Sequence, residues 1–138
     1  MTEISVDQIR KKILKNHSLS GLDLSGLNLR NMNMRGVNLS EANLSDCSLW
    51  GTDLKQAKLR RANLERANLT YVDFRYADLR DTNLKEATLI MANLEHAILN
   101  GAIISRANFS FCNLRYANLV GVCTSSAIFH ESSLDTKH

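Results

Sequence analysis

The sequence predicts an all-β fold in which the chain winds into a solenoid of stacked parallel coils behind a short N-terminal helix. A large apolar residue stands at every fifth position from Leu19 to Leu134, and Thr124 is the one exception among these 24 positions. The residue two places earlier is almost always small, and the residue between the two is usually Asn or Asp. Because no insertion disturbs this phase, the repeat itself is the unit of structure.

A period of five fits neither the 3.6 residues of a helical turn nor the alternation of a simple strand. Locally, however, the small and the large residue lie two apart, so both point to the same side, as in a strand. A turn every five residues then restores the phase, and each pentapeptide forms one short side of a coil. Four sides make a coil of 20 residues, so residues 17–134 predict about six coils stacked about 4.8 Å apart.

Residues 1–16 precede the repeat and predict an α-helical cap, with an amphipathic helix at residues 4–16. Its apolar stripe is formed by Val6, Ile9, Ile13 and Leu14. Its other face carries the cations Arg10, Lys11, Lys12 and Lys15. Basic amphipathic helices also bind membrane surfaces and calmodulin, and this alternative stays open. A cap is favoured because the first coil has unusually large inward residues on which a lid could pack: Leu22, Leu27 and Met32.

The repeat pattern weakens at the C-terminal end, from Cys123 onward, and residues 135–138, which follow Leu134, are expected to fray. Without a covering segment the last coil would expose backbone groups and apolar ends, so homodimerisation through this end is a hypothesis. The residues expected at that contact are Ile128, Phe129 and Leu134. Apolar residues also stand at positions that should face water, where they mark a contact or pack under the tail. They are Ile98, Ile103, Val120 and Ile128.

Three stretches of the chain resemble the A(D/N)LXX pattern of pentapeptide repeat proteins: ANLSD, RANLERANLTYVDFRYADLRDTNL and RANFSFCNLRYANL. The resemblance covers about 85% of the chain. It implies a right-handed quadrilateral parallel β-helix, usually capped at the N-terminus. It implies less about activity, because most members have no assigned biochemical role. The best understood branch is similar to duplex DNA in shape and charge and acts on DNA gyrase, conferring or modulating quinolone resistance, but fold alone does not transfer that function.

The outward residues form vertical columns, because residues 20 apart lie above one another if the coil has 20 residues. Two of these columns alternate in sign, which places an opposite charge about 4.8 Å from each charged residue. The columns are Asp46, Arg66, Glu86 and Arg106, and Glu41, Arg61 and Asp81. We interpret them as self-compensating, solvent-exposed charge columns that contribute little stability per pair.

A third column stacks three like charges in succession and lies beside aromatic corners. The column consists of Arg35, Lys55, Arg75, Glu95 and Arg115. One adjacent corner carries Tyr76, His96 and Tyr116, and the preceding corner carries Tyr71, Met91 and Phe111. Trp50 and Ile90 lie on the face between. We name this surface the basic–aromatic face. The residues expected to bind a partner are Arg35, Lys55, Arg75, Arg115, Trp50, Tyr71, Tyr76, Met91, Phe111 and Tyr116. Cationic and aromatic side chains together are typical of surfaces that bind a protein or a single-stranded nucleic acid, and a protein partner is favoured here.

A structural interpretation of the same face is also open. Asp53 and Asp73 precede Lys55 and Arg75 by two residues on the same side and would neutralise them. The two aspartates would also stack and could form a coupled carboxylate pair, although the adjacent cations favour simple ionisation.

Motifs for catalysis or cofactor binding are absent from the sequence, which has no Gly-rich phosphate loop, HExxH, GxSxG or EF-hand spacing. His17, His96 and His130 fall on different columns, and an axis filled with leucine leaves no cavity for a substrate. We therefore expect no enzymatic activity, no metal and no cofactor. Cys47 and Cys112 occupy inward positions, whereas Cys123 should point outward.

Composition narrows the class further. The net charge of +3, from 17 basic and 14 acidic residues, is too small to indicate nucleic-acid binding. No apolar run approaches the roughly 18–20 residues of a membrane span, and the N-terminus carries charges where a signal peptide would be apolar. Three cysteines without CxxC spacing suggest a reducing compartment, so we expect a cytoplasmic protein.

Three functions are compatible with these features. The leading hypothesis is a non-enzymatic, rigid protein-interaction module. The first alternative is a DNA mimic that binds gyrase or another topoisomerase, which requires an acidic face that no column supplies. The second alternative is a binder of anionic ligands or nucleic acid through the basic column, whose affinity would fall steeply with salt.

Overall fold

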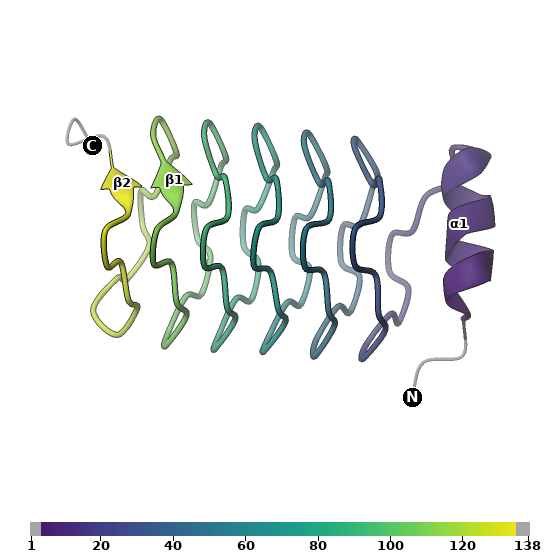
Figure 1. The fold of residues 1–138 in the computed structure, drawn as a ribbon, viewed down its shortest axis with the longest axis horizontal. Helices are drawn as coiled ribbons and strands as arrows, with labels where there is room; N and C mark the ends of the chain where they lie inside the picture. The colour runs from purple at the N-terminus through teal and green to yellow at the C-terminus, as the bar shows by residue number, and fades with distance from the viewer. Residues whose placement is uncertain (1–3, 135–138) are drawn as a thin grey trace.

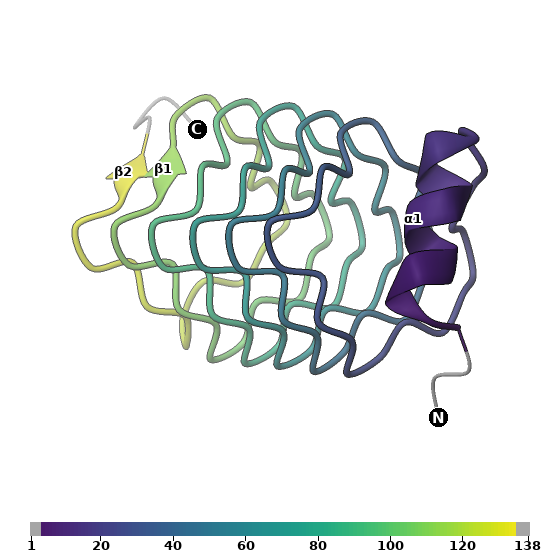
Figure 2. The same ribbon diagram turned by 45° about the vertical axis from the view of Figure 1, so that its right-hand side comes forward.

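The structure, a computed structural model, describes residues 4–134 and forms a rod with one helix across its N-terminal end (Figure 1). Successive coils lie side by side along the rod, from the helix to the C-terminal strands (Figures 1 and 2). Parallel bridges join residues 20 apart, from the pair Asp23 and Asn43 to the pair Asn108 and Ile128. The register is therefore the 20-residue spacing that the sequence predicts.

Regular strand is scarce in residues 4–134, although the all-β prediction suggests more. The two strands of these residues are β1 (Asn113–Leu114) and β2 (Ser133–Leu134), which pair in parallel. Elsewhere a side of a coil contributes one bridged residue. A turn every five residues leaves room for little more, so the chain has the connectivity of a parallel β-helix with very short sides.

The corners explain the Asn and Asp of the repeat. Asp53 Oδ1 accepts a hydrogen bond from the backbone N–H of Lys55 at 3.0 Å, and the equivalent bond recurs at other Asn and Asp residues of the repeat. These Asx turns lead into a corner residue with positive φ, such as Gly36 at 70° and Gln56 at 61°. A positive φ at this place is typical of a type II turn, and the sequence signals it only where the residue is glycine.

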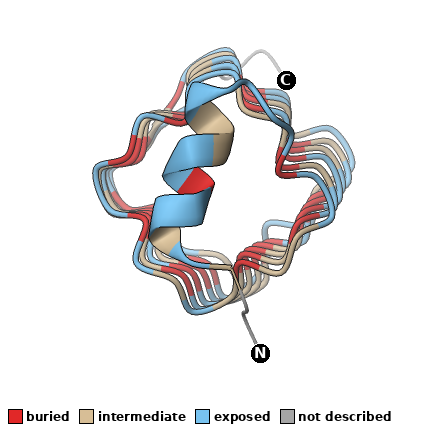
Figure 3. Ribbon diagram, turned by 90° about the vertical axis from the view of Figure 1, so that its right-hand side faces the viewer, coloured by how far each residue is buried: buried red, intermediate tan, exposed pale blue. Residues whose placement is uncertain are grey.

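The interior is apolar and closely filled. The central residues from Leu19 to Leu114 are fully buried, and the small residues two places earlier are almost as deeply buried (Figure 3). Polar atoms at some of these small positions donate to the preceding coil: Thr52 Oγ1 bonds the Leu29 carbonyl at 2.7 Å, and Cys47 Sγ bonds the Leu24 carbonyl at 2.9 Å. These bonds satisfy groups whose burial would otherwise destabilise the fold.

The N-terminal helix α1 (Val6–Leu14) lies across the open end of the first coil (Figures 2 and 3). It begins with a capping box, in which Gln8 N donates to Ser5 Oγ at 3.1 Å and Ser5 N donates to Gln8 Oε1 at 2.7 Å. Ile9 is fully buried against the coil, but Leu14 is 83% exposed. The prediction that Leu14 belongs to the buried stripe is wrong, because the stripe that packs on the coil turns away from the last residue of the helix. No helix within residues 4–134 has the length and apolar character needed to cross a membrane.

The last coil is irregular. No bridge joins Ile103 to the residue 20 places later, and Arg106 N bonds Ser126 Oγ at 3.2 Å instead of a backbone carbonyl. A cavity of about 270 Å³ lies between the last coil and the coil before it. It is lined by Gly101–Ser105, Gly121, Cys123 and Ser126. The expected fraying of residues 135–138 lies outside the described residues.

Candidate interaction surface

One corner of the basic–aromatic face is a continuous stack of rings. Tyr76 and His96 stack with ring centroids 4.8 Å apart and planes 8° apart, and His96 and Tyr116 stack at 4.8 Å and 14°. The 20-residue register places the three side chains on consecutive coils, which explains the stacking. Tyr76 and Tyr116 are each more than half exposed. Because each inner ring face contacts another ring, the stack offers mainly its edges and hydroxyl groups to a partner.

The other corner is apolar along much of the rod. Tyr71 is 51% exposed, and Met91 and Phe111 are each 44% exposed. Trp50 is half-buried between Arg30, whose guanidinium carbon lies 5.2 Å from the Trp50 ring centroid, and Tyr71, whose ring meets it edge-on at 5.3 Å. The sequence prediction did not include Arg30, and the signal for it was its position 20 residues before Trp50.

The basic column is less positive than its sequence suggests. Arg75 binds Asp73 through Nε and Nη2, the shortest contact being 2.7 Å from Nη2 to Oδ2. Burial opposes ionisation of Asp73, but the hydrogen bonds and charge of Arg75 lower its pKa below the ordinary value. Asp73 is therefore an ionised partner of Arg75 rather than half of a coupled carboxylate pair. Within residues 4–134, Arg35, Lys55 and Arg115 form no ion pair.

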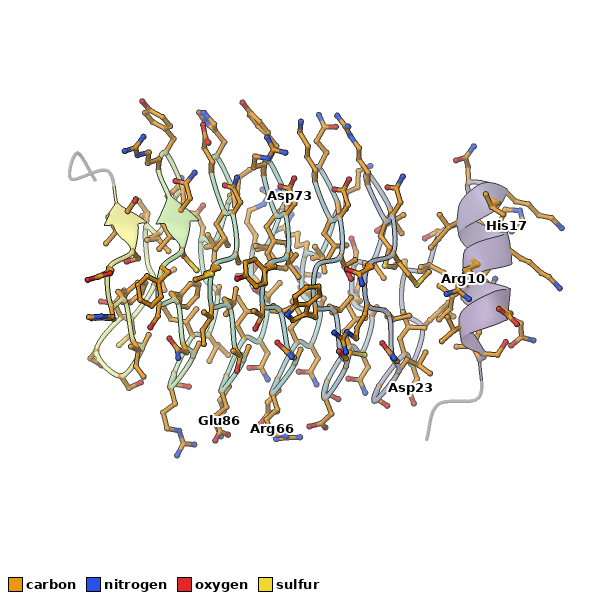
Figure 4. The ribbon with its side chains drawn as sticks, in the orientation of Figure 1. Arg10, His17, Asp23, Arg66, Asp73 and Glu86 are labelled. Atoms are coloured by element: carbon orange, nitrogen blue, oxygen red, sulfur yellow. The ribbon has the colours of Figure 1, made fainter. Side chains whose placement is uncertain are left out.

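Ion pairs neutralise much of the remaining exterior. Arg66 binds both carboxylate oxygens of Asp46, at 2.8 and 3.1 Å, and Arg106 lies 3.6 Å from Glu86, as the alternating column predicts. Figure 4 shows Arg66 and Glu86 on one edge of the rod and Asp73 on another. Within the described residues, the members of the second predicted column do not form ion pairs with one another. Its Asp81 instead lies 3.9 Å from Arg60, which reaches it from the neighbouring side.

The residues expected at a dimer contact lie in the last coil of residues 4–134. Ile128 is 50% and Leu134 is 46% exposed, whereas Phe129 is half-buried and stacks on Phe109 with centroids 5.1 Å apart. The outward apolar residues Ile98, Ile103 and Val120 are exposed as well. The structure therefore leaves an apolar surface around the C-terminal coils.

The reactive groups of the described chain are few. Burial raises the pKa of Cys47 to about 11 and that of Cys112 to about 12, so both are protonated at neutral pH. Cys123 is exposed, and a hydrogen bond with the Ser125 hydroxyl lowers its pKa. Residues 4–134 contain no group of three or more His, Cys, Asp or Glu residues that could hold a metal ion.

Comparison with protein-family models identifies the repeat. The model for pentapeptide repeats matches in eight copies, over residues 14–51, 51–85, 62–101 and 87–130. The chain belongs to the pentapeptide repeat family. Members of this family form right-handed quadrilateral β-helices and are generally structural or interaction modules. A search of curated protein sequences found no significant match.

Solved structures similar to this pentapeptide repeat protein come from plants and bacteria. A pentapeptide repeat protein from the thylakoid lumen of Arabidopsis thaliana is 30% identical, with a TM-score of 0.72 over 76% of this chain and 73% of that chain. The cyanobacterial protein Rfr23 of Cyanothece 51142 is 27% identical over 94% of this chain and 95% of its own, with a TM-score of 0.44. QnrB1, a plasmid-mediated fluoroquinolone resistance protein, is 16% identical over 86% and 85%, with a TM-score of 0.45.

Proposed function

We propose that this chain is a non-enzymatic protein-interaction module: a rod of about six coils that presents the basic–aromatic face to a protein partner. The observation that carries the proposal is the exposure of Tyr71, Tyr76 and Tyr116. Each side chain is more than half exposed and none belongs to the buried core. Exposed tyrosine clusters are enriched at protein interfaces. Free cations at Arg35 and Arg115 would add selectivity for a partner with carboxylates nearby.

The geometry favours the aromatic corners over the basic column as the source of affinity. Arg75 is already bound to Asp73, so a partner would have to displace an existing ion pair to use it. The corner formed by Tyr71, Met91 and Phe111 is apolar, and each of the three side chains is about half exposed. A contact there would remove apolar surface from water, which is the main favourable contribution in most protein interfaces.

The two alternatives have weaker support. A DNA mimic needs an acidic face, whereas the carboxylates Asp46, Asp73 and Asp78 are each bound to an arginine. Single-stranded nucleic acid needs free ring faces on which bases can stack, whereas those of His96 are both occupied by tyrosine rings.

Reduced cysteines and a cytoplasmic location remain predictions.

A pull-down from native lysate with matched baits tests the proposal. We expect wild type to hold a partner that the variant Tyr71→Ala/Phe111→Ala loses, because the variant removes the two largest side chains of the apolar corner. The variant Lys58→Ala/Arg61→Ala, altered at exposed residues outside the face, is the control and should keep the partner. Identical capture by all three baits, with folding verified by circular dichroism, would exclude this face as the binding surface.

A further inference from the structure

The positive charge of the rod is concentrated at its helical end. Residues 4–40 contain six arginines and lysines and two carboxylates, whereas residues 41–134 contain ten of each. The six cations are Arg10, Lys11, Lys12, Lys15, Arg30 and Arg35. The net charge of the described chain therefore lies almost entirely on α1 and the first coil, a distribution that the total of +3 conceals.

The cations of this end are also less paired than those elsewhere. In the middle of the rod, Arg66, Arg75 and Arg80 each bind a carboxylate at 2.7 to 2.8 Å. At the helical end Arg10 pairs with Asp7 at 3.1 Å, and both side chains are largely exposed. Within residues 4–134, no ion pair involves the other five cations of this end. Uncompensated like charges repel one another, and an anionic ligand would relieve that repulsion.

A groove lies among these cations. Its volume is about 490 Å³, and its walls come from α1 and the first coil: Arg10, Ile13, Leu14 and Arg30–Asn33. Figure 4 places Arg10 at this end of the rod, beside the first coil. We name it the N-terminal groove. It combines two guanidinium groups with the apolar side chains of Ile13, Leu14 and Met32, a combination that suits a ligand with both carboxylates and an apolar group.

The positions of the Leu14 and Arg30 side chains are not explained by the packing of α1 on the first coil. Leu14 is 83% exposed although the other apolar residues of α1 pack against the coil. Arg30 is held over the Trp50 ring, and within the described residues no hydrogen bond uses its guanidinium N–H groups. A guanidinium fixed in place with free N–H groups can bind a carboxylate at a small cost in side-chain entropy.

We propose that the N-terminal groove binds an acidic peptide segment of a partner protein, with carboxylates on Arg10 and Arg30 and one large apolar side chain on Leu14. The carboxylate on Arg10 would replace its ion pair with Asp7, in which both side chains are largely exposed. A lipid surface is less favoured, because the apolar face of α1 is occupied by the coil and could insert only if the cap detached. Nucleic acid is less favoured, because the groove has no aromatic lining for base stacking. This site adjoins the basic–aromatic face through the contact of Arg30 with Trp50, but its ligand contacts do not depend on the proposed function.

Fluorescence anisotropy with a rhodamine-labelled peptide of alternating glutamate and leucine tests the proposal. We expect binding that weakens as salt rises, and affinity at least about tenfold lower for Arg10→Gln/Arg30→Gln, which loses two charge-assisted contacts. Leu14→Ser should also bind more weakly and yet unfold at the wild-type temperature, because Leu14 is exposed. The matched control Lys58→Gln/Arg61→Gln removes two exposed cations from the middle of the rod and should bind like wild type.

Other outcomes overturn the proposal. Equal losses in the two double variants would show nonspecific attraction to positive charge, and unchanged affinity in Arg10→Gln/Arg30→Gln would exclude the groove. Binding of phosphatidylserine vesicles or a uridine oligonucleotide in the absence of peptide binding would assign the groove to another class of partner. Amide chemical shifts of the wild-type protein give a test without variants. Peptide-induced changes confined to residues 10–14 and 30–33 support the site, and changes spread along the rod contradict it.

Discussion

At the scale of the residue, the fold depends on what a small inward position can hold. Ala57 and Ala62 are 1% exposed, beside central leucines that are fully buried. Because both alanines are almost completely buried beside these leucines, little space remains for a larger side chain. The thiols and hydroxyls that replace alanine at Cys47 and Thr52 are tolerated because each donates a hydrogen bond to a carbonyl of the coil before.

Enlarging one such residue should destabilise the rod. We expect Ala57→Leu to lower the free energy of unfolding by about 1–3 kcal/mol, because the added methyl groups force neighbouring side chains from their rotamers. Urea denaturation followed by circular dichroism measures the change. The next residue supplies the control: Lys58 is exposed, so Lys58→Leu should alter stability by less than about 0.5 kcal/mol. Equal effects of the two substitutions would contradict the inward assignment of Ala57.

At the scale of the element, α1 closes one end of the solenoid by a single deep contact. Ile9 is the buried residue of the helix, and it fills the opening of the first coil. The capping box of Ser5 and Gln8 fixes where the helix begins, so the position of Ile9 along the helix is set as well. We therefore expect the helix to behave as a separate lid whose attachment depends mainly on Ile9, with Val6 and Ile13 partly buried beside it.

Truncation of that contact should release the lid. We expect Ile9→Ala to cost about 2–5 kcal/mol in the attachment of α1, as for other fully buried aliphatic side chains. Hydrogen exchange would then show loss of protection in Val6–Leu14 and the first coil, while the later coils stay protected. Leu14→Ala on the same helix is the control, and its exposed side chain predicts little change. Uniform protection in the Ile9→Ala protein would refute the lid interpretation.

At the scale of the whole molecule, the two ends of the rod are unlike each other. The N-terminal end is covered by α1, whereas the last coil of residues 4–134 exposes the apolar side chains of Ile128 and Leu134. Exposed edges of this kind favour association with another edge, and a closed two-fold contact prevents further growth. These features support a homodimer joined through the C-terminal coils.

Light scattering at rising concentration measures that association. We expect the mass of a dimer for wild type and that of a monomer for Ile128→Glu/Leu134→Glu, because two buried like charges on each partner would face their symmetry mates. The variant Gln56→Glu, altered at an exposed corner in the middle of the rod, serves as the control for added charge. A monomeric mass for wild type at high concentration would overturn the hypothesis.

Sequence periodicity was sufficient for the register and for the inward positions, because a period of five with central leucines allows one phase only. It also placed Asp46 beside Arg66, since vertical neighbours follow from the coil length. The spacing of two residues on one side likewise placed Asp73 beside Arg75. The pairing of Asp81 with Arg60 and the exposure of Leu14 were not predictable in this way. An outward side chain can reach several neighbouring charges. Which one it contacts depends on its rotamer and on the geometry of the corner, and the sequence repeat specifies neither.

The 20-residue register also determines which insertions and deletions keep the surface columns of the rod intact. A deletion of one pentapeptide between Asp46 and Arg66 would preserve the leucine phase but rotate every downstream side by a quarter turn, so Arg66 would no longer lie above Asp46. A duplication or loss of 20 residues would leave each column continuous and each surface in line. During evolution, such a rod can therefore gain or lose whole coils while its outward columns stay aligned.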